Sequence, residues 1–194
     1  MLRALGNEGV RRVATVVRDG TPYDEVDLTG AVAFVLGNEA HGLPTELDAV
    51  VDVRDPGNLG TVLRSAEASG VGGIICCDGS VDVYNPKCVR ASAGSLFHTR
   101  VVARGDPVTV LGTLGDWGLR RLGTRPEGGE PYHRVDLRGP TALVLGNEAN
   151  GLPAPAAAAL DGWVSIPMAG RSESLNVGMA AAVLCFEAAR QRRS

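Results

Sequence analysis

The chain has 194 residues, of which 44% are hydrophobic and 21% charged, and these values are ordinary for one globular domain with an appendage. Its formal net charge of −3 argues against a broad basic surface that binds nucleic acid non-specifically, so any such contact must use local positive charge. The sequence contains no secretory leader and no apolar run long enough to span a bilayer, which predicts a cytoplasmic protein without a membrane partner.

An internal repeat occupies the first part of the chain. Residues 2–44 align without a gap to 111–153 at a constant offset of 109, and 24 of the 43 aligned pairs are identical. The longest shared run is V-L-G-N-E-A-x-G-L-P, at 35–44 and again at 144–153. Such a match does not arise by chance. Each copy is predicted to form a helix, a strand, a polar turn, a second strand and a glycine-rich loop.

The repeat suggests a division of the chain. We expect residues 1–45 to form an N-terminal segment that duplicates 111–153, and residues 46–194 to form the main domain. The copies differ at 43 − 24 = 19 positions, so they are not a simple cloned duplicate. A tandem duplication that lost the end of its first copy and an engineered rearrangement of chain ends both remain open.

Helices and strands are predicted to alternate through the main domain. A turn at 54–58 precedes a helix over 59–69 that stops at Gly70, and a strand follows over 71–77. Further helices are expected over 88–96, 108–117, 154–160 and 177–190, and further strands over 119–124, 142–145 and 163–166. Short apolar strands separated by helices predict an α/β fold, with a parallel sheet that carries helices on both faces.

The four cysteines stand at positions 76, 77, 88 and 185. They form no C-x-x-C pair and no cysteine–histidine set with the spacing of metal ligands. We therefore expect free thiols in a reducing compartment, without disulfides and without a metal site.

Four motifs follow one another along the main domain. D-P-G-N-L-G-T-V-L-R-S-A occupies 55–66, and Y-N-P-K-x-V-R-A-S-x-G-S-L-F occupies 84–97. A-L-V-L-G-N-E-A-x-G-L follows at 142–152, and I-P-M at 166–168 is followed by S-L-N at 174–176. Together, over nearly all of 50–190, they resemble the TrmH (SpoU) family of RNA ribose methyltransferases in the SPOUT superfamily.

The resemblance implies a fold and an activity. The expected fold includes a trefoil knot near the C-terminus, which ordinary rules of topology exclude and which periodicity cannot reveal. The expected activity is methylation of a ribose 2′-hydroxyl in RNA with S-adenosylmethionine as cofactor, with ribosomal RNA favoured over transfer RNA. The resemblance also implies a homodimer with RNA bound across both subunits.

Carried over position by position, the resemblance implies five catalytic residues: Asn58, Arg64, Glu148, Ser174 and Asn176. Attack of a hydroxyl on an activated methyl group needs positioning and charge stabilisation more than a strong acid. We expect Arg64 to act electrostatically and not as a base, because a guanidinium is extremely hard to deprotonate. Asn58 and Glu148 are expected to orient loops. The alternatives are a surface helix arginine for Arg64 and a solvated loop carboxylate for Glu148.

The resemblance further implies the residues that bind the cofactor: Thr124, Leu145, Gly146, Ile166, Met168, Leu175 and Asn176. A glycine lets backbone approach a ligand closely, and we expect this role for Gly146 in preference to one in packing. Thr124 could equally mark the start of a turn. Ser174 and Asn176 are also residue types that cap the start of a helix, which is the alternative interpretation of that stretch.

Positive charge that could meet RNA is confined to a few positions: Lys87, Arg90, Arg100, Arg104, Arg190, Arg192 and Arg193. The last three could equally complement the dipole of a C-terminal helix. The apolar character of the helix expected at 177–190 fits burial in a dimer interface and burial in the core of one subunit equally well.

The sequence departs from the family before its first motif. Many members carry an RNA-binding domain there, whereas this chain carries the repeat, whose Glu39 has no third motif behind it and is not expected to be catalytic. The main alternative function is a knotted protein of the same fold, such as an engineered or rearranged folding model, that binds S-adenosylmethionine or RNA without turnover. A Rossmann-type methyltransferase is disfavoured, because no glycine-rich loop after an N-terminal strand is followed by an acidic residue about 20 positions later.

Overall fold

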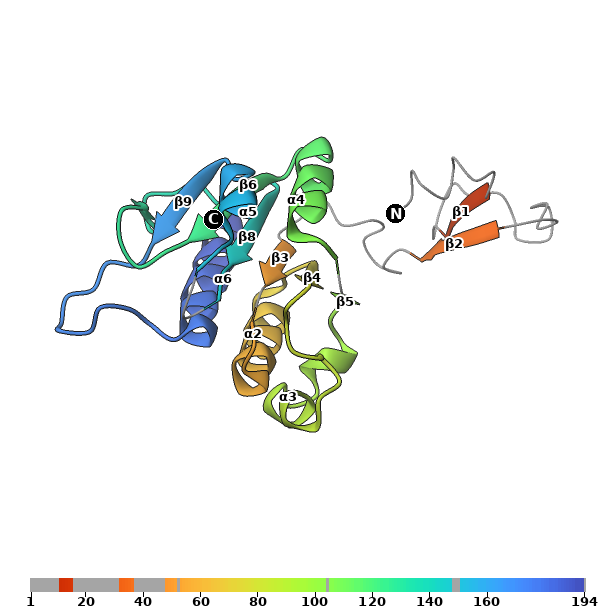
Figure 1. The fold of residues 1–194 in the computed structure, drawn as a ribbon, viewed down its shortest axis with the longest axis horizontal. Coiled ribbons are helices and arrows are strands. Elements are labelled where there is room, and N and C mark those ends of the chain that lie inside the picture. The colour runs from red at the N-terminus through yellow and green to blue at the C-terminus, as the bar shows by residue number, and fades with distance from the viewer. Residues whose placement is uncertain are drawn as a thin grey trace. The chain divides into compact units, whose positions relative to one another are not determined.

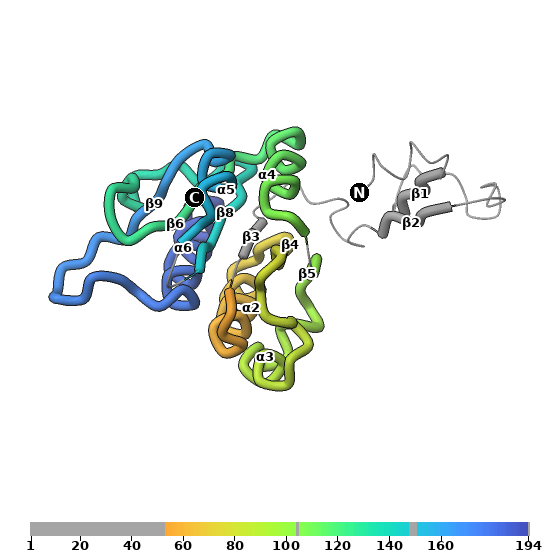
Figure 2. The backbone as a smooth tube through the Cα atoms, viewed as in Figure 1, coloured from red at the N-terminus to blue at the C-terminus, as the bar shows by residue number. Residues whose placement is uncertain are grey.

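The protein is described by a computed structural model. It describes residues 53–103, 105–147 and 151–193, together with the backbone of three strands that lie before residue 53. The chain divides into two compact units, Met1–Pro44 and Thr45–Ser194, within one residue of the boundary expected from the repeat. Figures 1 and 2 trace both units, which are described separately here.

The N-terminal unit contains one pair of parallel strands, β1 (Arg11–Thr15) and β2 (Val32–Leu36). Arg11 lies opposite Val32 in this pair. In the second unit Arg120 lies opposite Thr141, and both residue numbers are larger by 109. The two repeats therefore pair their strands in the same register. The helix expected before β1 and the glycine-rich loop with Glu39 lie outside the described residues.

The second unit is built on a seven-stranded parallel sheet in the order β5-β4-β3-β8-β6-β9-β7 (Figure 1). Its strands are β3 (Asp48–Val51), β4 (Gly73–Cys76), β5 (Val101–Ala103), β6 (Arg120–Thr124), β7 (Glu130–Pro131), β8 (Thr141–Leu145) and β9 (Gly162–Ser165). Every residue of the central strand β8 is buried. A strand covered on both faces is continuously apolar, as the sequence T-A-L-V-L nearly is.

Helices cover both faces of this sheet, as predicted. They are α2 (Pro56–Ser69), α3 (Pro86–Ala91), α4 (Pro107–Asp116), α5 (Ala154–Ala158) and α6 (Val177–Arg193), with a short 3-10 helix η1 (Ser95–Phe97). Helices α2 and α6 pack in one core cluster with Leu143 and Leu145 of β8. Helices α4 and α5 pack in another with Ala142 and Val144. Successive residues of a strand point to opposite faces, so β8 divides the two cores.

Two predicted boundaries are wrong. Helix α2 begins at Pro56 and absorbs most of the turn expected at 54–58, because Asp55 caps it by accepting the Asn58 N–H at 2.9 Å. The single helix expected at 88–96 is two elements, α3 and η1, because the chain turns between them at Ala93 with φ of 50° and at Gly94 with φ of 94°.

The order of the last three strands gives the sheet an unusual connection. β9 lies between β6 and β7, although only residues 125–129 join those two strands. The Arg125 N–H donates to the Val164 carbonyl at 3.1 Å, and the Tyr132 N–H donates to the Ser165 carbonyl at 2.9 Å. A Cβ on Gly129 would lie 2.7 Å from the carbonyl carbon of Val164. The connection therefore runs closely around β9.

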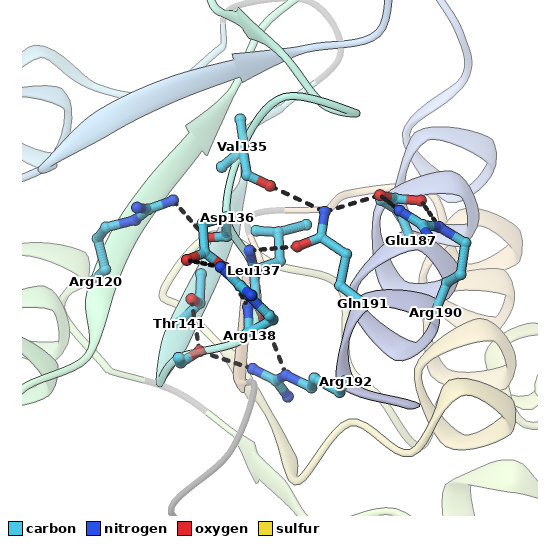
Figure 3. Close-up of polar contacts among 11 residues, drawn as sticks. Arg120, Val135, Asp136, Leu137, Arg138, Thr141, Glu187, Arg190, Gln191 and Arg192 are labelled. Atoms are coloured by element: carbon cyan, nitrogen blue, oxygen red, sulfur yellow. Dashed lines mark hydrogen bonds and ion pairs between the residues drawn. The ribbon is translucent and has the colours of Figure 1, made fainter. Parts of the chain in front are cut away.

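The end of α6 is fastened to the segment 135–139 before β8 (Figure 3). The Gln191 amide accepts from the Leu137 N–H at 2.8 Å and donates to the Val135 carbonyl at 3.0 Å. The Arg192 guanidinium donates to the carbonyls of Leu137 and Gly139 at 3.0 and 2.9 Å. The side chains of Gln191 and Arg192 thus provide the hydrogen-bond partners that a neighbouring strand would otherwise give to the backbone of this irregular segment. None of the helices in the described part is long and apolar enough to cross a membrane.

Candidate functional site

Two asparagines join the starts of helices α2 and α6. The Asn176 side-chain oxygen accepts the Gly178 N–H at 2.9 Å, so Asn176 caps α6. Its amide nitrogen donates to the side-chain oxygen of Asn58 in the first turn of α2, also at 2.9 Å. Two of the predicted catalytic residues, 118 positions apart in the chain, are therefore in direct contact. Both helix starts carry the positive end of a helix dipole.

The two helices approach each other closely at this point. A Cβ on Gly178 would lie 3.0 Å from the side chain of Thr61 in α2. Because side chains rarely tolerate such a distance, the glycine lets α6 begin against α2. The Asn58–Asn176 hydrogen bond is thus supported by tight packing beneath it.

The start of α3 is tied to the same place. The Lys87 ammonium lies 3.0 Å from Asp55, the residue that caps α2, and both side chains are about half exposed. This hydrogen bond, with the cap itself, lowers the pKa of the Asp55 carboxyl. A Cβ on Gly60 would lie 2.4 Å from that of Ala91, so α2 and α3 also pack closely.

A cavity of about 90 Å³ lies beside the start of α6, between β6, β9 and the loop that leads into the helix. Four of the predicted cofactor residues line it, namely Thr124, Ile166, Met168 and Leu175, together with the predicted catalytic residue Ser174. The other six lining residues are Arg125, Pro126, Val164, Glu173, Ala180 and Leu184. Most of these side chains are apolar, and the polar groups sit at the carboxyl ends of strands and on the loop. Ligand sites of parallel sheets form at such strand ends.

Arg125 is a residue of this cavity that the sequence analysis missed. Its guanidinium carbon lies 4.9 Å from the ring centroid of Trp163, which indicates a cation–π contact. It also donates a hydrogen bond to the Gly128 carbonyl. The arginine is therefore held at the rim of the cavity, where Glu173 supplies an opposite charge. The available signal was its position directly after Thr124, at the end of β6.

The other predicted residues lie elsewhere. Leu145 is buried in the core, and neither it nor Gly146 lines the cavity. A Cβ on Gly146 would lie 2.7 Å from the carbonyl carbon of Gly151, so packing also requires a glycine there, and its expected role in cofactor binding stays a prediction. Arg64 is exposed on α2. Glu148 lies outside the described residues.

The four cysteines are free and buried. Burial raises the pKa of the Cys76 and Cys185 thiols to about 12, so neither forms a reactive thiolate at neutral pH. Among the described residues no three histidine, cysteine or acidic side chains are grouped as metal ligands would be.

Comparison with known proteins decides the family. The model of the SpoU rRNA Methylase family matches residues 47–186. The chain belongs to the SpoU methylase family. The resemblance inferred from the four motifs is thereby confirmed, and the α/β fold with its parallel sheet agrees with solved structures of this family.

Individual relatives are similar over different lengths. The chain is 41% identical to the 23S rRNA (guanosine-2′-O-)-methyltransferase RlmB of Xanthomonas axonopodis pv. citri, over 94% of this chain and 78% of the relative. It is 39% identical to the 23S rRNA (guanosine(2553)-2′-O)-methyltransferase RlmP of Bacillus subtilis, over 69% of this chain and 54% of the relative. The first curated relatives are spanned over only about half of their length.

The solved structures include the SpoU methyltransferase AviRb from Streptomyces viridochromogenes in complex with the cofactor AdoMet. This chain is 28% identical to it, with a TM-score of 0.70 over 99% of this chain and 87% of that one. An AdoMet-bound rRNA methyltransferase from Sinorhizobium meliloti is 34% identical, with a TM-score of 0.66 over 75% of this chain and 56% of that one.

Proposed function

We propose that this SpoU methylase family protein transfers a methyl group from S-adenosylmethionine to a ribose 2′-hydroxyl of RNA. The observation that carries the proposal is the contact between Asn58 and Asn176, which joins the first and last motifs beside a cavity lined by Ser174. Relatives at 39% and 41% identity are named 23S rRNA 2′-O-methyltransferases, which favours ribosomal RNA as the substrate.

The cavity residues fit S-adenosylmethionine in chemical type. Ile166, Met168 and Leu175 offer apolar surface to an adenine ring, and Arg125 and Glu173 match the opposite charges of an amino acid group. The cofactor supplies a methyl group that is already activated by a sulfonium charge.

We assign Arg64 to the RNA side of the reaction from its charge and its exposure. It follows Asn58 by six residues on α2, which is about 9 Å along the helix axis, and its side chain is exposed. A guanidinium can hold a phosphate and stabilise an alkoxide as the ribose hydroxyl loses its proton. The hydrogen bond between Asn58 and Asn176 holds the starts of α2 and α6 next to each other.

The threading of the C-terminal part is also a proposal. β9 lies between β6 and β7, whose connection passes around it, and α6 continues from β9. This arrangement supports the trefoil knot that the motifs imply.

We further propose that the protein acts as a homodimer. Met179 and Phe186 are seven positions apart on α6, hence on one face, and are 62% and 50% exposed. An apolar stripe on an amphipathic helix is unfavourable in water, and a second copy of the same face would cover it. In this assignment residues 46–194 form the catalytic domain, residues 1–45 are a partial copy of it, and the protein works in the cytoplasm.

Methyl transfer to unmodified ribosomal RNA tests the function. The purified chain is incubated with methyl-labelled S-adenosylmethionine and rRNA transcribed in vitro, and the labelled nucleotide is mapped by its resistance to alkaline cleavage. Label in a 2′-O-methylated ribose is the expected result. Cofactor binding in a calorimetric titration without any transfer to RNA would instead favour the knotted binding protein that lacks turnover.

A further inference from the structure

A second, open hollow of about 330 Å³ lies at the other end of α6 from the cofactor cavity. It is lined by seven residues from two segments: His133, Arg134, Val135, Asp136 and Arg138 before β8, and Arg190 and Gln191 near the end of α6. None of them lines the cofactor cavity, which α6 meets at Ala180 and Leu184. From Ala180 to Arg190 the distance along the helix is about 15 Å, from a rise of about 1.5 Å per residue.

Positive charge dominates this hollow. Three of its lining residues are arginines and one is an aspartate, and α6 adds Arg192 and Arg193 directly beside it. Asp136 pairs with Arg138 at 2.9 Å, and Glu187 pairs with Arg190 at 2.7 Å. Two carboxylates thus face five arginines in a chain whose net charge is −3. The local charge has the opposite sign to that of the whole molecule.

The hollow is also held in shape. Gln191 and Arg192 fasten α6 to the backbone of 135–139 with four hydrogen bonds, and Arg120 donates to the Asp136 carbonyl at 2.9 Å (Figure 3). The two segments that carry the arginines are therefore fixed relative to each other. A ligand that bridges the two segments does not have to order them, so little conformational entropy of the protein is lost on binding.

We propose that this hollow binds phosphodiester groups of the RNA substrate, away from the nucleotide that is methylated. Cationic side chains attract phosphate groups through their charge, and contacts to phosphates position a nucleic acid without reading its sequence. The inference rests on the proposed function, since it assigns part of the RNA surface of the same enzyme. An RNA that occupies both places must extend well beyond its target nucleotide.

Substitution of Arg134 and Arg138 tests the proposal, because both line the hollow from the segment before β8 and neither lies on α6, the helix of the proposed dimer interface. Arg138 pairs with Asp136 at the surface, where such a pair contributes little to stability. The double variant Arg134→Gln/Arg138→Gln is compared with Arg134→Lys/Arg138→Lys, which keeps both charges. RNA affinity is measured by fluorescence anisotropy with 23S rRNA fragments between about 50 and 200 mM salt, and methyl transfer is followed in parallel.

The glutamine variant should bind RNA about ten-fold more weakly at about 0.1 M salt, with a salt dependence reduced by roughly 0.7 in slope for each phosphate that the protein no longer neutralises. The KM for RNA should rise while kcat and the melting temperature stay unchanged, and the lysine variant should remain within about two-fold of the parent protein. A glutamine variant with the parent's affinity and salt slope would overturn the inference. So would equal losses in both variants, since charge would then not be the cause. A parent protein that binds RNA but never methylates it would overturn the proposed function and leave this surface standing.

Discussion

At the scale of single residues, the Asn176 side chain both caps α6 and links this helix to α2 through Asn58. One side-chain oxygen caps α6, and the amide nitrogen beside it reaches across to α2. Stability and geometry are therefore coupled at Asn176. A substitution that keeps the capping oxygen of Asn176 but removes its amide donor separates the contribution to stability from the contribution to the geometry of the site.

Asn176→Ala removes both groups and should lower stability by about 1 kcal/mol, the usual contribution of a helix cap. Asn176→Asp keeps the capping oxygen and loses the donor to Asn58, so it should unfold close to the parent protein. Methyl transfer should fall in both variants, because each lacks the link between the helices. The checks are thermal unfolding and a transfer assay. An alanine variant with the parent's melting temperature would show that the cap contributes nothing.

Arg64→Ala should lower methyl transfer by at least about 100-fold, the effect of removing one electrostatic donor from a reacting oxygen. The side chain is exposed, so the melting temperature and the affinity for the cofactor product S-adenosylhomocysteine should change little. Arg64→Lys keeps the charge without the fork and should recover only part of the rate. A comparable loss of S-adenosylhomocysteine binding in the calorimeter would place Arg64 on the cofactor side instead.

The sequence predicted the site residues only through the resemblance of its motifs. No local pattern brings Asn58 and Asn176 together, because their contact depends on how α2 and α6 pack. Arg125, Arg134 and Arg138 were missed for the same reason, since their surroundings arise where distant segments meet, whereas the arginines of α6 beside the hollow were named as possible RNA contacts. The packing of Gly146 against the backbone of Gly151 was likewise not visible in the sequence.

At the scale of elements, the hydrophobic periodicity was a good guide. The strands and helices of the main sheet appear where alternation and caps predict them, with ends displaced by a few residues. β3, β5 and β7 were not predicted, and β5 and β7, with three and two residues, are too short to show a period. The insertion of β9 between β6 and β7 left no trace in local composition, since strand order is set by packing across the sheet.

Gly129 makes the tight passage around β9 possible, and its substitution should be costly. In Gly129→Ala the new methyl would meet the Val164 backbone at 2.7 Å, and overpacking of this kind typically destabilises by about 1–3 kcal/mol. The control is Gly139→Ala, where nothing lies within 4 Å of the added Cβ. Urea unfolding at equilibrium compares the two. Equal free energies of unfolding would mean that the connection yields without strain.

At the scale of the whole molecule, the proposed dimer places the exposed face of α6 in its interface. Phe186→Glu should convert the proposed dimer to a monomer, because a charge in an apolar interface loses its water without gaining a partner. Trp117→Glu replaces a similarly exposed aromatic residue at the end of α4 and should leave the dimer intact. Sedimentation velocity over a range of protein concentrations reports the mass. A parent protein that is monomeric throughout would refute the assignment of this face.

The two described strands of the N-terminal unit, β1 and β2, repeat the β6–β8 pairing. Because the copy at 111–153 is continuous with β9 and α6, we expect it and not the N-terminal copy to form the cofactor cavity. Deletion of residues 1–44 should leave folding and S-adenosylhomocysteine affinity intact, as judged by circular dichroism and calorimetry. Loss of both, together with a fully active Glu148→Ala variant of the whole chain, would show that the N-terminal copy has taken that place.

The position of β9 also constrains how the protein is made. β7 ends at residue 131 and β9 begins at residue 162, so the ribosome delivers the inner strand after both of its neighbours. At about 5–20 residues per second, the 30 intervening residues take roughly 2–6 s to appear. During that interval β6 presents an unpaired edge, the kind of surface at which nascent chains aggregate. If another segment paired with this edge of β6 first, β9 could not enter the sheet between β6 and β7. The domain must therefore complete its folding after synthesis has passed β9.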